Sequence, residues 1–157
     1  MDALLNLFTG LENEDLDWIL SQACEQKYMA HIDIINEGEV PEALYIVLQG
    51  LLEIKSSSSG ATLSLLGPGE IVGEMTLLEM ITASETVSTI EPSILLAIPR
   101  EQIFEKLRDD AAFAGRFFKS LAILMARRLR ESNGKLGLEL SKEEGVDLRG
   151  QSKAVSG

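Results

Sequence analysis

The sequence contains few of the residue types that build metal sites, disulfides or nucleophilic triads. Its 157 residues include one cysteine, Cys24, and one histidine, His31. A single cysteine excludes an internal disulfide and suits a reducing compartment. One histidine without a cysteine cluster excludes a zinc site of ordinary spacing and gives no credible Ser-His-Asp arrangement. We therefore expect a protein that is not an enzyme and holds no metal.

Long apolar runs are also missing. No stretch approaches the roughly 20 apolar residues that a membrane-spanning helix needs. Asp2 follows Met1, and no positively charged segment precedes an apolar run, as a signal peptide would require. With 45% hydrophobic residues the chain can still form one domain with a sizeable core. We expect a cytoplasmic protein without a membrane segment.

Basic residues are scarce outside one segment. Residues 1–110 carry 20 acidic and 5 basic side chains, whereas residues 111–135 carry 6 basic and 1 acidic. The formal net charge of −11 opposes general nucleic-acid binding, which requires Lys and Arg to neutralise phosphates. The plain interpretation is a soluble acidic protein with one basic helix. The alternative is membrane or nucleic-acid contact through the bases of this helix, which are Arg116, Lys119, Arg127 and Arg130.

The apolar pattern changes from helical to strand-like and back to helical. Leu16, Ile19, Leu20 and Ala23 have the spacing of an amphipathic helix. Short apolar runs bounded by glycine and proline then predict strands at residues 33–36, 44–48, 51–55, 62–66, 86–90 and 94–98. Strands spaced about 8 to 12 residues apart favour an antiparallel sandwich or barrel. After Pro99, a short helix around Ile103 and a longer one at residues 111–132 are predicted.

A glycine–glutamate pair, Gly73–Glu74, precedes a short helical turn at residues 74–78. The start of such a turn offers backbone N–H donors and a positive helix terminus, which suit an anion. A carboxylate beside an anion site needs a separate role, such as accepting hydrogen bonds from hydroxyl groups. The alternative is that Glu74 caps the turn or pairs with a base.

Five landmarks in order resemble the cyclic-nucleotide-binding domain family, in particular the sensor domain of bacterial catabolite activators. They are Leu7–Phe8 with Leu11, the segments 36–39, 43–50 and 66–70, and the cassette at residues 67–87. The resemblance extends from about residue 7 to residue 137. It implies a mainly β fold, an antiparallel β-roll or jelly roll (double-stranded β-helix) with an N-terminal helix and two C-terminal helices. The domain would cover residues 1–136, followed by a polar, disordered tail at residues 137–157.

The resemblance also assigns roles within the cassette. In the family, the glutamate after the glycine holds the ribose 2′-hydroxyl, and an arginine near the cassette's end clamps the cyclic phosphate. Here the glutamate is Glu74, but Ala83 stands at the arginine position and is followed by Ser84. We therefore expect weak binding of cAMP. The ligand-binding residues that the resemblance implies are Gly73, Glu74, Met75, Thr76, Ala83, Ser84, Thr86, Arg128, Ser132 and Asn133.

Three of these residues lie on the long helix. Arg128 falls within the helix's apolar face, and a buried charge must be paired. In the family the corresponding arginine approaches the cassette glutamate, so we expect an Arg128–Glu74 pair that gives a phosphate a substitute positive charge. The alternative is that Arg128 reaches solvent at a dimer edge. Ser132 and Asn133 align with a polar pair that meets the purine base in some bacterial members, or they simply end the helix.

In related transcription factors the long helix forms the dimer seam and moves a DNA-binding domain when ligand binds. We expect no winged helix-turn-helix domain after the long helix, since only about 20 residues follow Gly137 in the sequence. We expect a homodimer through residues 111–132, or a helix that serves only the core, with a partner protein or a change of oligomer as output. The predicted function is a non-catalytic regulatory domain that senses a cyclic nucleotide or related small anion and needs no other cofactor. The alternative is a degenerate, ligand-free dimerisation or partner-interaction module.

Overall fold

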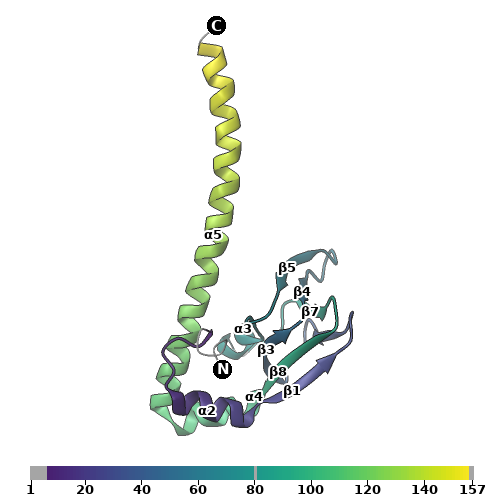
Figure 1. Cartoon of the computed structure of the whole chain (residues 1–157), viewed down its shortest axis with the longest axis vertical. Coiled ribbons are helices and arrows are strands. Elements are labelled where there is room, and N and C mark those ends of the chain that lie inside the picture. The colour runs from purple at the N-terminus through teal and green to yellow at the C-terminus, as the bar shows by residue number, and fades with distance from the viewer. Residues whose placement is uncertain (1–6, 80, 156–157) are drawn as a thin grey trace. The chain divides into compact units, whose positions relative to one another are not determined.

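The computed structural model describes residues 7–79 and 81–155, with side chains for residues 7–79 and 81–134 (Figure 1). The chain divides into two compact units, Met1–Leu121 and Ala122–Gly157. The first unit contains every described strand, the helices α2, α3 and α4, and the first turns of α5. The second unit is the rest of α5. No helix in the described residues is both long enough and apolar enough to cross a membrane.

The strands of the first unit form two four-stranded antiparallel sheets. The strand order is β1-β8-β3-β6 in one sheet and β2-β7-β4-β5 in the other. The predicted antiparallel jelly-roll architecture with flanking helices is confirmed. The bounds are β1 (Cys24–Tyr28), β2 (Asp33–Ile35), β3 (Ala43–Gln49), β4 (Leu52–Lys55), β5 (Thr62–Leu66), β6 (Ile71–Val72), β7 (Thr86–Thr89) and β8 (Ser93–Pro99).

One apolar cluster joins the two sheets. It takes Val47 and Leu95 from one sheet and Leu52 from the other, all at most 1% exposed. Burying each such side chain contributes about 1.5–3 kcal/mol. Val72, directly before the cassette glycine, and Ala83, near the cassette's end, belong to the same cluster. The core therefore holds both ends of the cassette in place.

Six of the strands lie where the apolar pattern predicted them, and two were missed. β1 pairs with β8 from Cys24↔Ala97 to Tyr28↔Ser93, yet its side chains are exposed or only half-buried. Its sequence therefore lacks an apolar alternation. β6 consists of two residues paired with Tyr45 and Ile46 of β3, which is too short to give a periodic signal.

Helices α2 (Asn13–Gln22), α4 (Arg100–Asp109) and the start of α5 (Ala111–Val155) pack together. The Asp15 carboxylate accepts two hydrogen bonds from Arg116, at 2.7 Å from Nε and 2.8 Å from Nη2. Trp18 packs edge-on against Phe113 at a centroid distance of 5.3 Å. Arg116 is thus committed to an ion pair within the first unit. This corrects its placement on an exposed basic face.

The apolar face of α5 has two parts. Phe113, Phe117 and Leu121 are at most 1% exposed and belong to the core of the first unit, whereas Phe118 is 43% exposed. Leu121 therefore serves packing and cannot be a partner contact. The first part of the helix covers its own unit and still leaves an apolar residue facing outward.

The long helix extends further than its pattern indicated. It runs without interruption to Val155, whereas an end near residue 132 was predicted. A glycine inside a helix costs only about 1 kcal/mol relative to alanine, so Gly134 and Gly137 need not end it. The next residues, 138–144, are mostly good helix formers, including Leu138 and Glu139. The domain boundary at residue 136 stays a prediction.

Candidate functional site

The cassette begins at a turn that requires glycine. Gly73 links β6 to α3 (Glu74–Glu79) with a φ of +94°, in the region that L-residues with a side chain rarely adopt. A Cβ there would also lie 3.2 Å from the carbonyl oxygen of Ala43 in β3. The turn therefore presses the start of α3 against the sheet. This close approach fixes the position of the residue that follows.

That residue is Glu74, which is only 5% exposed. Thr76, 8% exposed, donates a hydrogen bond from Oγ1 to the Gly73 carbonyl oxygen at 2.9 Å, which closes the first turn of α3. Met75 between them is 59% exposed. A buried carboxylate must accept hydrogen bonds, and the hydroxyl groups of a sugar are suitable donors. The arrangement can thus recognise a ligand that carries hydroxyl groups.

Ala83, at the position of the family's arginine, is 6% exposed and its methyl group belongs to the apolar core cluster. Its backbone is held by the 36–39 turn: Ala83 N donates to Glu39 O, and Gly38 N donates to Ala83 O, each at 2.8 Å. The backbone at Ala83 is therefore well fixed. The side chain that it presents is apolar and carries no charge for a phosphate.

The residues after Ala83 are more accessible. Ser84 is exposed, and Thr86 at the start of β7 is half-buried. The Thr86 hydroxyl accepts a hydrogen bond from the Glu37 backbone N–H at 3.2 Å. Seven of the predicted ligand-binding residues belong to the first unit, those from Gly73 to Thr76 and Ala83, Ser84 and Thr86.

The other three predicted residues, Arg128, Ser132 and Asn133, lie on α5 in the second unit. All three are helical, so the helix does not end at Ser132 and Asn133. Arg128 is half-buried. The Arg128–Glu74 pair and the contact of Ser132 and Asn133 with a base stay predictions.

The structure adds one residue that the pattern did not single out. Arg100 is the first residue of α4, and its Nη2 donates to the Thr76 carbonyl oxygen at 3.4 Å. Its guanidinium lies 4.9 Å from the centroid of the Phe104 ring. Arg100 thus connects the cassette helix to α4. An arginine after Pro99 carries no sequence signal for this role.

The electrostatics of the core are simple. Burial raises the pKa of Tyr45 to about 12, and the nearby Tyr28 and Glu42 add to the effect. The Tyr45 phenol is therefore neutral at physiological pH.

Within residues 7–79 and 81–134, no group of three or more His, Cys, Asp or Glu side chains is placed to hold a metal.

Comparison with known proteins agrees with this geometry. The chain is 38% identical over 141 residues to the cyclic AMP receptor protein of Thermus thermophilus, covering 88% of this chain and 63% of that protein. It is 26% identical over 121 residues to the cAMP-dependent protein kinase regulatory subunit of Emericella nidulans, covering 70% and 29%. The chain thus spans less than two thirds of either relative.

Among solved structures, the Thermus thermophilus catabolite activator protein superposes with a TM-score of 0.64 at 37% identity, over 84% of this chain and 62% of that one. The family model for the cyclic nucleotide-binding domain matches residues 25–110, more than half of the chain. That range contains both sheets from Glu25 onward, the complete cassette and α4. The chain therefore belongs to the cyclic nucleotide-binding domain family.

Proposed function

We propose that this protein is a non-catalytic regulatory domain that binds a cyclic nucleotide or related small anion and signals through α5. The ligand lies over the cassette, with Glu74 on its hydroxyl groups and the backbone around Met75, together with Ser84 and Thr86, near its anionic group. The observation that carries the proposal is the buried side chain of Glu74 directly after the turn at Gly73, whose positive φ favours glycine. A carboxylate at this place in the cassette can accept hydrogen bonds from the hydroxyl groups of a sugar, which supports a binding role.

Binding of cAMP is weak in this proposal because of Ala83. A charge-assisted hydrogen bond contributes about 1.5–3 kcal/mol, and an arginine fork makes two of them to a phosphate. Without the fork, the dissociation constant rises on the order of 100-fold or more. Arg128 from α5 supplies a partial replacement if it approaches Glu74, as the family resemblance suggests.

The direct test is thermal denaturation with cAMP, cGMP, AMP and cyclic dinucleotides, each at about 1 mM. Ligand at 100 times its Kd adds about 2.7 kcal/mol, which is several degrees for a domain of this size. We expect a smaller but measurable shift for one cyclic nucleotide. The variant Glu74→Gln abolishes that shift, whereas Glu79→Gln, at the exposed end of the same helix, keeps it.

The same melting experiment tests a second function, which is suggested by the place of Ala83 in the apolar core cluster. A methyl group in that position favours a domain that has lost its ligand and acts as a dimerisation or partner-binding module. Such a module gives no shift with any nucleotide, and Glu74→Gln changes only its stability. The same melting curves therefore separate the two functions.

A further inference from the structure

A small polar pocket lies at the start of β3, beside the turn that holds Ala83. Its volume is about 150 Å³, and its walls come from the end of β2, the 36–42 segment and Tyr45 of β3. Since one water molecule takes up about 30 Å³, the pocket has room for a ligand of only a few heavy atoms. None of its lining residues belongs to the predicted ligand-binding set of the cassette.

Backbone hydrogen bonds fix the walls of this pocket on both sides. Gly38 N donates to Ala83 O, and Ala83 N donates to Glu39 O, each at 2.8 Å. At the other side, Arg100 N donates to Glu42 O at 2.9 Å. The pocket is therefore formed by a segment that is tied to the cassette and to α4, and small-molecule sites are usually preformed in this way.

Two acidic side chains line the pocket, and its lining contains no base to neutralise them. They are Glu39 and Glu42, and neither takes part in a salt bridge within the described residues. A hydrogen bond of 3.3 Å from Asn36 Nδ2 engages one oxygen of Glu39. Residues 28–54 contain no lysine or arginine. The pocket thus carries negative charge that a cationic ligand would neutralise.

The base closest to this segment along the backbone contacts is Arg100, and its guanidinium is engaged elsewhere. Its Nη2 donates to the Thr76 carbonyl oxygen at 3.4 Å, and the guanidinium lies 4.9 Å from the centroid of the Phe104 ring. No salt bridge of Arg100 is present in the part of the chain whose side chains are described. The formal net charge of −11 further favours cations near the molecule.

Tyr45 adds a hydroxyl group without a partner to the same pocket. Tyr45 is 7% exposed, and within the described residues its hydroxyl forms no hydrogen bond. The fully enclosed side-chain atoms without a partner are Arg100 Nη1 and Ser120 Oγ, so the Tyr45 oxygen is not enclosed and opens into the pocket that the residue lines. A buried phenol usually has a hydrogen-bond partner, which a donor inside the pocket would supply.

We propose that this pocket binds a small alkylammonium ion. The N–H groups of the ion donate to the carboxylates of Glu39 and Glu42 and to the Tyr45 oxygen, and its short alkyl chain lies against Val40 and Pro41. The apolar part of the lining favours an organic cation over a metal ion, which prefers oxygen ligands and water. The proposal is separate from nucleotide binding and does not depend on it.

The experiment is a titration of the full chain with n-butylammonium chloride, followed by ¹H–¹⁵N NMR at constant ionic strength. We expect saturable shifts of the amide signals of residues 34–45. Two probes serve as controls: n-butanol has the same alkyl chain without the charge, and sodium chloride has the charge without the chain. Neither should produce saturable shifts of these signals.

Three variants then test the named groups. Tyr45→Phe keeps the ring and should weaken binding of n-butylammonium by about 3- to 10-fold, and Glu42→Gln by about tenfold or more. The matched control is Glu37→Gln, which changes the same charge at an exposed position of the same turn that does not line the pocket. It should leave the affinity unchanged. Melting of each variant without ligand checks that it stays folded.

Several outcomes would overturn the proposal. Shifts that do not saturate, or an equal loss in Glu37→Gln and Glu42→Gln, would show only general attraction of cations to an acidic surface. Saturable shifts with calcium chloride but not with n-butylammonium would make the pocket a metal site. No nucleotide is present in this titration, so its result and that of the nucleotide melting test are independent.

Discussion

Replacing Ala83 with arginine tests whether the cassette is a cyclic nucleotide site that lacks only the guanidinium group that binds the phosphate. Two hydrogen bonds at Ala83 N and O, each 2.8 Å long, fix the backbone there, so the new side chain starts from a defined point. If its guanidinium reaches the phosphate, two charge-assisted hydrogen bonds of about 1.5–3 kcal/mol each give about 3–6 kcal/mol. Affinity for cAMP should then rise on the order of 10²- to 10⁴-fold.

The same substitution should destabilise the unliganded protein. Ala83 is 6% exposed within the apolar core cluster, and an unpaired guanidinium in such a place costs several kcal/mol. We therefore expect Ala83→Arg to melt below the parent without ligand and to regain that loss as cAMP is added. The partly buried cation and the bound phosphate stabilise one another, which is the physical origin of the recovery.

The assay is titration calorimetry with cAMP, together with melting curves at several cAMP concentrations. Ala83→Met is the matched control, because it adds volume without charge and should lower stability with no gain in affinity. Adding Glu74→Gln to Ala83→Arg should remove most of the gain. A folded Ala83→Arg protein that binds cAMP no better than the parent would refute the assignment of this position as the phosphate clamp.

Two further predictions concern stability. Arg116 holds the pKa of Asp15 below its usual value, so the pair stabilises the fold above about pH 4, the ordinary aspartate pKa, and this contribution disappears as the pH falls through the lowered pKa. In urea denaturation Asp15→Ala should lose about 1.5–3 kcal/mol at neutral pH and show a weaker acid dependence than the parent; an unchanged acid profile would contradict this. Gly73→Ala should cost about 1–2 kcal/mol because of its positive φ and the 3.2 Å approach to Ala43 O, while Gly67→Ala, with open space around it, should be nearly neutral.

The sequence predicted those parts of the fold that repeat a local pattern. β5 was predicted with its observed ends, because Thr62–Leu66 is bounded by a serine-rich turn and by Gly67–Pro68. β1 was missed because its pairing with β8 depends on backbone hydrogen bonds rather than on apolar side chains. Strand order could not be predicted at all. The neighbours β1 and β8 are separated by most of the domain, and no local rule connects them.

The candidate site and its surroundings likewise contain residues that the sequence could identify and residues that it could not. Gly73 could be identified because the turn favours glycine, and Glu74 because the family resemblance places a glutamate directly after that glycine. The Asp15–Arg116 pair could not, because the two residues are 101 positions apart and each resembles an ordinary surface charge in its own helix. The distinction between Leu121, which is buried, and Phe118, which is exposed, also depends on packing that a helical wheel does not contain.

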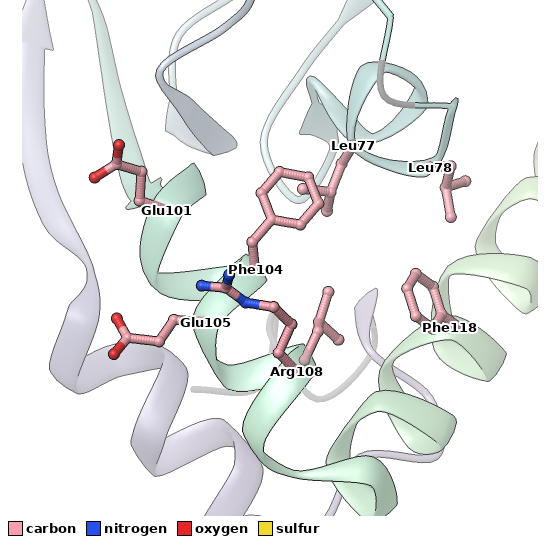
Figure 2. Close-up of a pocket in the computed structure, with 8 residues that line it drawn as sticks. Leu77, Leu78, Glu101, Phe104, Glu105, Arg108 and Phe118 are labelled. Atoms are coloured by element: carbon pink, nitrogen blue, oxygen red, sulfur yellow. The ribbon is translucent and has the colours of Figure 1, made fainter.

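The cassette is physically connected to an apolar groove lined by Leu77, Leu78, Phe104 and Phe118 (Figure 2), because α3 contributes residues to both. The Thr76 carbonyl oxygen accepts a hydrogen bond from Arg100, whose guanidinium lies against Phe104, and Phe104 and Leu77 both line the groove. A ligand that shifts α3 must therefore alter either the Arg100 hydrogen bond or the wall of the groove. By linkage, a partner that binds the groove and prefers one position of α3 changes ligand affinity by the same factor as the ligand changes the partner's affinity. If the proposed ligand binds, this reciprocity gives the domain a route to report it that requires no movement larger than that of one short helix.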